Sequence, residues 1–157
     1  MQTQWLNGSL TVKGGLLVAK VLIVGGDVAT RQTLRALCGD LGWSVHAAAD
    51  PRVALQGAAP RRVDLLLVIA EGGDDGEDDV LDQFAALRSE VWPAPLVVVV
   101  RGVDLPTRRR AFRLGAADVV CVSAALDEVR ARLVAVQRHS GRHAHEGAAP
   151  SPGAVLS

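Results

Sequence analysis

The sequence has few cysteines, no excess of charge of either sign and no long hydrophobic run. Its two cysteines, Cys38 and Cys121, each lie in an apolar stretch, so we expect two buried free thiols rather than a disulfide or a redox pair. Seventeen basic and 17 acidic residues cancel, which excludes a global charge signal for nucleic acid or an anionic membrane. No apolar run approaches the roughly 20 residues that span a bilayer, and no signal peptide is evident, so we expect a cytoplasmic protein.

Three ligand-binding patterns are present only in part. Residues 25–27 (GGD) follow a strand pattern, but the G-x-G-x-x-G and G-x-x-x-x-G-K-[ST] spacings are missing, so a tight turn is favoured over a phosphate loop. The acidic run 71–79 lacks EF-hand spacing, which favours a solvated loop over a weak metal or partner site. His139, His143 and His145 lie close to a tail expected to be disordered, so we expect no metal site and no cofactor there.

Strand-like and helix-like patterns alternate regularly from residue 19 to residue 138. The runs VLIV, LLLVI and LVVVV are continuously aliphatic, which is typical of strands buried on both faces of a parallel sheet. Five strands alternating with five helices predict an α/β fold, a doubly wound parallel sheet covered on both faces. The expected strands are residues 19–24, 43–47, 64–69, 96–100 and 119–122. The expected helices are residues 30–41, 51–57, about 80–87, 106–114 and about 126–138.

The chain is long enough for one domain with flexible ends. Residues 1–17 are expected to be an N-terminal extension punctuated by glycines, and residues 18–140 the domain itself. Residues 141–157 are rich in Gly, Ala and Pro and are expected to be a flexible tail. Within the domain, Thr30 is the expected N-cap of the first helix, and Gly42 is its expected stop.

Several ordered segments resemble the receiver domain of bacterial two-component response regulators. They are AKVLIV, TRQTLRALCGDLGWSVHAAAD, VDLLLVI and RRRAFRLGAADVV, of which RLGAAD at residues 113–118 is the most specific. The resemblance covers residues 19–138 and implies a flavodoxin-like sheet with strand order 2-1-3-4-5. Receivers of this family accept a phosphoryl group from a histidine kinase on an aspartate.

The family's chemical positions fall here on residues that lack the necessary atoms. In the family an acid pair holds Mg²⁺, an aspartate is phosphorylated, and a Thr or Ser, a Lys and a cis proline complete the site. The resemblance places these positions on Gly25 and Gly26, Ile69, Val100, Val122 and Ser123, respectively. Glycine and aliphatic side chains supply neither metal ligands nor a nucleophile. We therefore expect a pseudo-receiver that is not an enzyme, and we assign no metal to the remaining acid, Asp27.

The expected function is a regulatory protein–protein interaction module that works without phosphorylation. In the family, phosphorylation shifts a pre-existing equilibrium of the face formed here by residues 106–114, 119–122 and 126–138. A protein partner or a second copy of the chain is expected to bind this face, with no direct contact to nucleic acid or membrane. The residues expected to carry it are Arg109, Arg113, Asp118, Glu128 and Arg132. Two alternatives stay open: a small-ligand sensor that uses the degenerate cleft at the strand ends, and a residual enzyme of unknown type.

Overall fold

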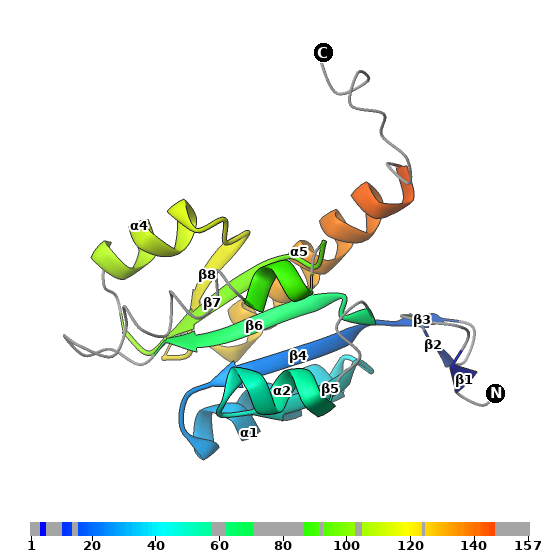
Figure 1. The fold of residues 1–157 in the computed structure, drawn as a ribbon, viewed down its shortest axis with the longest axis horizontal. Coiled ribbons are helices and arrows are strands. Elements are labelled where there is room, and N and C mark those ends of the chain that lie inside the picture. Colours follow the sequence, from blue (N-terminus) through cyan, green and yellow to red (C-terminus); the bar gives the residue numbers. More distant parts are fainter. Residues whose placement is uncertain are drawn as a thin grey trace, which may run out of the picture.

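A five-stranded parallel sheet forms the centre of the molecule (Figure 1). The computed structural model describes residues 4–5, 11–13, 16–57, 62–70, 87–91, 93–102, 105–123 and 125–146. The strands are β4 (Lys20–Gly25), β5 (Ser44–Ala48), β6 (Leu65–Ala70), β7 (Leu96–Val100) and β8 (Asp118–Cys121). They pair in the order β5-β4-β6-β7-β8, with every neighbouring pair parallel. Numbered along the chain, this order is 2-1-3-4-5, so the predicted topology is confirmed.

Helices cover both faces of this sheet. Within the described residues they are α1 (Val28–Asp40), α2 (Pro51–Gly57), α4 (Leu105–Arg113) and α5 (Leu126–Glu146). One apolar cluster joins α1 and α5 to one face, and a second joins α2 and α4 to the other. The expected helix at residues 80–87 lies almost entirely outside the described residues. The doubly wound architecture predicted from the alternation is confirmed.

The two apolar clusters follow from the alternation of side chains along each strand. In β4, Val21 and Ile23 pack with α1 and α5, whereas Leu22 and Val24 pack on the opposite face. Every residue of β6 and β7 is buried, as expected of central strands covered on both sides. Because the aliphatic runs continue to the last residue of β6 and β7, the carboxyl edge of the sheet is apolar as well.

The predicted helix limits are wrong at two places. Asp27, not Thr30, is the N-cap of α1, because the Asp27 carboxylate accepts a hydrogen bond from the Thr30 backbone N–H. Helix α5 continues to Glu146 instead of ending near Arg138. The next proline in the sequence is Pro150, so only one glycine in 139–146 opposes the helix. The part of the expected tail at 147–157 lies outside the described residues.

The N-terminal extension contains regular structure that the sequence analysis did not predict. Strands β1 (Gln4–Trp5), β2 (Thr11–Lys13) and β3 (Leu16–Val18) form a separate antiparallel sheet in that order. The missed signal is the pair Gly14 and Gly15 between two short β-prone runs, a spacing typical of a hairpin. Among the described residues no helix is both long and apolar enough to cross a membrane.

Candidate functional site

The residues that the resemblance places at the phosphorylation site lie at the carboxyl ends of the central strands. Gly25 ends β4 and is the register partner of Ile69 in β6, and Val100 ends β7. Val122 and Ser123 follow β8 directly. Because these strands are parallel, their carboxyl ends share one edge of the sheet. We call this group of residues, Gly25, Gly26, Ile69, Val100, Val122 and Ser123, the strand-end site.

The side chain of Ile69 fills the space above Gly26. Ile69 is 1% exposed, and a Cβ atom on Gly26 would lie 2.5 Å from Ile69 Cγ2 and 2.9 Å from its Cβ and Cδ1. A Cβ on Gly25 would lie 2.9 Å from the Ile69 carbonyl oxygen. Both glycines also have positive φ, 92° and 69°, which side chains rarely adopt. The backbone and packing at positions 25 and 26 therefore oppose any side chain, including an acid pair.

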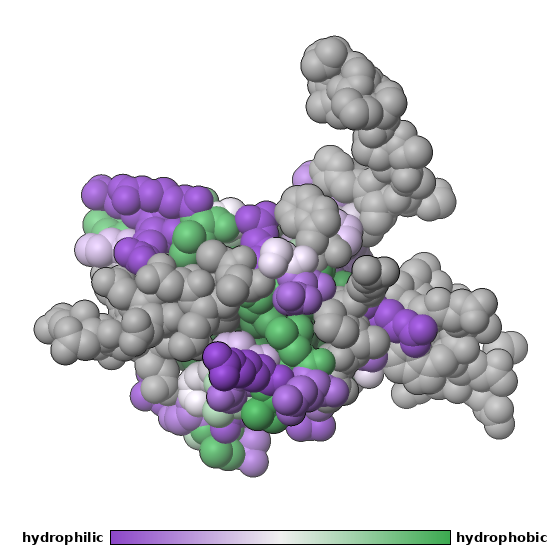
Figure 2. Space-filling model, in the orientation of Figure 1, coloured by the Kyte–Doolittle hydropathy of each residue, from purple (hydrophilic) through white to green (hydrophobic). Residues whose placement is uncertain are grey.

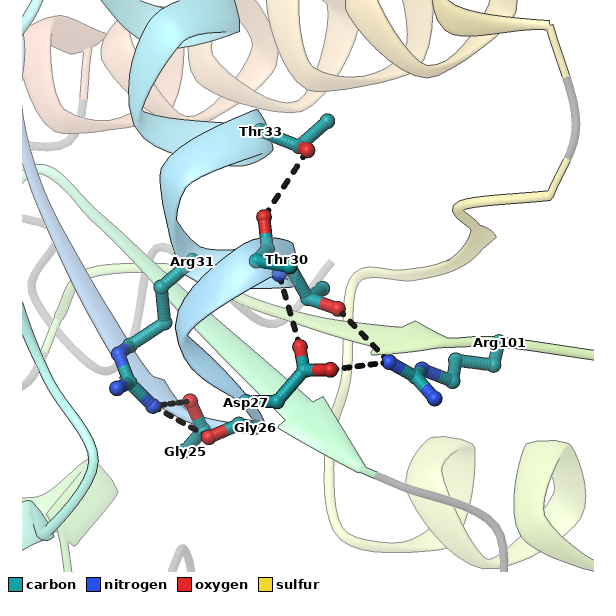
Figure 3. A network of polar contacts seen from close by, with 8 residues as sticks. Gly25, Gly26, Asp27, Thr30, Arg31, Thr33 and Arg101 are labelled. Carbon is teal, nitrogen blue, oxygen red and sulfur yellow. Dashed lines mark hydrogen bonds and ion pairs between the residues drawn. The ribbon is translucent and has the colours of Figure 1, made fainter.

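The Arg31 side chain is hydrogen-bonded to the backbone of the glycine turn. Arg31 Nη1, on the first turn of α1, donates to the carbonyl oxygen of Gly25 at 3.0 Å and also to that of Gly26 (Figure 3). These bonds supply a donor to two backbone carbonyl oxygens at the turn. The turn is therefore anchored by the positively charged side chain of Arg31.

Asp27 is the acid that remains at the strand ends, and its carboxylate is fully engaged. One oxygen accepts the Thr30 backbone N–H at 2.8 Å, which caps α1. The other oxygen forms an ion pair with Arg101, the residue after β7, and the same Arg101 nitrogen lies 3.5 Å from Thr30 Oγ1 (Figure 3). The hydrogen bonds from the Thr30 side chain and backbone, together with the Arg101 charge, lower the pKa of Asp27. Asp27 thus stays an anion with its partners supplied by the chain.

Apolar side chains and a thiol lie at the end of β8. Val122, at the family's Lys position, packs against the cluster of α1 and α5, and Val100 is buried. Cys121 Sγ donates to the Arg101 carbonyl oxygen at 3.3 Å and lies 2.8 Å from Ser123 Oγ. Both cysteines are free, but only Cys38 is buried; the expectation of a buried thiol is wrong for Cys121, which lies partly exposed on the edge strand.

Charged residues gather on a second surface, the α4–β8–α5 face (Arg109, Arg113, Asp118, Glu128 and Arg132). Arg132 bridges two acids: its Nη1 is 3.1 Å from Asp118 Oδ1, and its Nη2 is 3.7 Å from Glu128 Oε1. Arg109 and Arg113 are exposed, and neither has an ion pair or hydrogen bond within the described part of the chain. The structure therefore brings three of the five predicted residues into one network and leaves two cations open to solvent.

Helix α4 carries charge of only one sign. Its sequence, LPTRRRAFR, contains four arginines and no acid, and Leu105 and Phe112 are exposed beside them. Figure 2 shows hydrophilic side chains over α4 with hydrophobic surface next to them. Such a surface combines positive charge with apolar contact area.

Sequence reasoning missed the roles of Arg31 and Arg101. The cap could have been found, because Asp27 stands directly before the helical pattern in a position typical of N-caps. Arg101 is 74 residues from Asp27 in the chain, so only the register of β4, β6 and β7 brings them together. Within the described residues no group of three or more His, Cys, Asp or Glu side chains is placed to hold a metal ion.

Comparison with solved structures establishes the fold of this chain. It is similar to the chemotaxis protein CheY4 of Vibrio cholerae, with TM-score 0.62 and 22% identity over 76% of this chain and 98% of that one. It is similar to the signal receiver domain of an HD domain-containing protein from Pseudomonas fluorescens, with TM-score 0.67 and 21% identity over 82% and 93% of the two chains. A receiver domain of a LuxO repressor protein from Vibrio parahaemolyticus gives TM-score 0.66 and 14% identity over 83% and 98%.

These neighbours share the five-stranded sheet order described above, so the chain has the fold of response-regulator receiver domains. No protein-family model and no curated protein matches the sequence.

Proposed function

We propose that this protein is a phosphorylation-independent receiver that regulates signalling by binding another protein or a second copy of itself. The observation that carries the proposal is Ile69, which is buried at the acceptor position and packed over Gly26. Phosphoryl transfer needs a nucleophile, a metal and a countercharge arranged around one point. None of the six residues of the strand-end site offers a carboxylate or an ammonium group, so we infer that this chain is not an enzyme.

The proposed interaction surface is the α4–β8–α5 face. Its unpaired cations, Arg109 and Arg113, are exposed on a helix that carries no acid, which favours a partner surface of negative charge. The network of Asp118, Arg132 and Glu128 beside them is partly exposed and offers both signs of charge. This combination supports association that is electrostatically complementary and weakened by salt.

The packing at the strand-end site does not support ligand sensing there. The Ile69 side chain occupies the volume that the loss of the acid pair would have vacated. The expectations of a cytoplasmic location and of no direct contact to nucleic acid stay predictions.

Two experiments test the proposal. Incubation with Mg²⁺ and acetyl phosphate should leave the intact mass unchanged, and an acid-labile gain of one phosphoryl group would contradict phosphorylation independence. For the face, Arg109→Glu with Arg113→Glu should weaken self-association or partner capture by about tenfold or more, because repulsion replaces attraction. Analytical ultracentrifugation and pull-down at two salt concentrations measure this effect.

A matched control uses the same change of charge elsewhere. Arg35 and Arg52 are exposed on α1 and α2, outside the face. Arg35→Glu with Arg52→Glu should leave association intact. Equal loss in both double variants would mean that net charge, and not this face, governs association.

A further inference from the structure

A cavity of about 160 Å³ lies between α4 and α5 at β8, the edge strand of the sheet. Its apolar lining includes Val119 and Val129, and its polar lining includes Arg108, Glu128, Arg132 and the thiol of Cys121. Gly25, Gly26 and Ile69 do not line it. Val100 does line it, so the cavity adjoins the strand-end site at the end of β7 but lies apart from the packed turn at Gly25 and Gly26.

Arg108 is the cation in the cavity lining that has no ion pair within the described residues. It is half-buried, and no ion pair or hydrogen bond engages its guanidinium within the described part of the chain. A guanidinium that is partly withdrawn from water and unpaired is a favourable site for an oxyanion, because a planar anion can accept two parallel hydrogen bonds from it.

Arg132 lines the cavity as well, and its position is fixed. Asp118 at 3.1 Å and Glu128 at 3.7 Å hold it, so little side-chain freedom is lost when a ligand contacts it. Glu128 also lines the cavity with negative charge, which disfavours a ligand of charge −2 or more. Together these charges favour a ligand with one negative charge, placed near Arg108.

We propose that this cavity binds a small monocarboxylic acid with a compact apolar body. The carboxylate pairs with Arg108, and a branched aliphatic or aromatic group packs on Val119 and Val129. A cavity of about 150 Å³ accommodates a benzene ring, so the volume here suits an acid of roughly that size. The inference does not rest on the proposed interaction, although Glu128 and Arg132 belong to both surfaces, so a bound acid would contact residues of the α4–β8–α5 face.

Alkylation of Cys121 can report whether a ligand occupies the cavity. It lines the cavity and is partly exposed, whereas Cys38 is fully buried and burial raises the pKa of its thiol to about 12. Alkylation of the folded protein should therefore add one group, at Cys121, because the thiolate is the reactive form. Millimolar benzoate or isobutyrate should slow this reaction and raise the melting temperature, while neutral benzamide should do neither.

Two single substitutions decide whether the anion site is Arg108. Arg108→Gln should weaken benzoate binding, measured by titration calorimetry, by at least about tenfold, or about 1.4 kcal/mol. Arg109→Gln, on the next residue of the same helix but outside the cavity lining, should leave it unchanged. Retained melting temperatures of both variants show that the helix is intact.

Three results would overturn the proposal. One is that neither acid protects Cys121 or shifts the melting temperature. Another is that benzamide binds as well as benzoate, which would make the cavity an apolar site without anion recognition. The third is that a short poly-glutamate peptide binds instead, with equal loss in Arg108→Gln and Arg109→Gln, which would assign these arginines to a protein-docking surface.

Discussion

The strand-end site and the α4–β8–α5 face differ in what their polar and charged groups are bonded to. At the strand-end site, Ile69 is buried, the glycines are packed against it, and Asp27 is bonded to Thr30 and Arg101. On the face, Arg109 and Arg113 are exposed and have no ion pair or hydrogen bond among the described residues. Groups whose partners are all inside the chain stabilise the fold, whereas exposed unpaired charges are available to another molecule. Substitutions should therefore affect stability in the first region and association in the second.

The largest effect is expected from a carboxylate at the acceptor position. Ile69→Asp should lower the free energy of unfolding by about 3–5 kcal/mol, because the charge would be buried without a cation or metal. Ile69→Val, the matched control, should cost only about 0.5–1.5 kcal/mol. Urea denaturation measures both. An aspartate variant that is as stable as the valine variant, or that becomes phosphorylated, would show that the strand-end site is more open than its packing indicates.

A side chain at position 26 should have the next largest effect. Gly26→Ala should cost about 2–5 kcal/mol, from a positive φ of 69° and a contact of 2.5 Å with Ile69 Cγ2. In an Ile69→Ala background the contact is gone, so the same substitution should cost about 1–3 kcal/mol less. A double-mutant cycle measures this coupling, and additive costs would mean that Ile69 does not restrict position 26.

A smaller loss is expected when the cap of α1 is removed. Asp27→Ala should lower the melting temperature by about 2–4 °C, since it leaves the Thr30 N–H without its acceptor. Asp27→Asn keeps an acceptor but loses the ion pair with Arg101, and it should change the melting temperature much less, because both partners are roughly half exposed. If the two variants were equally destabilised, the ion pair rather than the cap would be the main contribution of Asp27.

The sequence was sufficient for the sheet and its order but not for the contacts at the strand ends. Continuous aliphatic runs specify strands such as Leu96–Val100, whose predicted limits match the structure, because each run can be buried only between two layers of helices. That position 69 carries no carboxylate also follows from residue type alone. The packing of Ile69 on Gly26 and the pairing of Arg101 with Asp27 depend on strand register and rotamers, which no local pattern encodes. The end of α5 does not follow the Gly-, Ala- and Pro-rich composition of 141–157, because the residues up to Glu146 still have enough helix propensity to continue the helix.

The smallest effect is expected at the amino end of β6, where Asp64 belongs to neither region. There, burial raises the pKa of Asp64 to about 6, although Lys20 opposes the shift through its backbone N–H, 2.8 Å from Asp64 Oδ2, and its charge. Because the folded-state pKa is the higher one, this group stabilises the fold fully below about pH 4, and that contribution is lost as pH rises through about 6. The melting temperature should therefore fall modestly over this window.

Asp64→Asn isolates this pH dependence, because the amide keeps an acceptor for the Lys20 N–H but does not titrate. The variant should lose the downward slope between about pH 4 and pH 6 and gain stability relative to the parent protein at neutral pH. An unchanged slope would assign the pH dependence to another group whose pKa rises on folding; Asp27 is not such a group, because its pKa is lowered and its contribution to stability increases with pH.

The contact between Gly26 and Ile69 also constrains the order in which mutations can accumulate. While isoleucine is present, a first mutation to any acid at position 26 is penalised by the clash, whatever ligand it would later supply. A first mutation to aspartate at position 69 is penalised by its unpaired charge. A smaller residue at position 69 removes the clash, so the cost of a side chain at position 26 depends on which residue stands at position 69. A route from this sequence to an acid at position 26 would therefore pass first through a residue smaller than isoleucine at position 69.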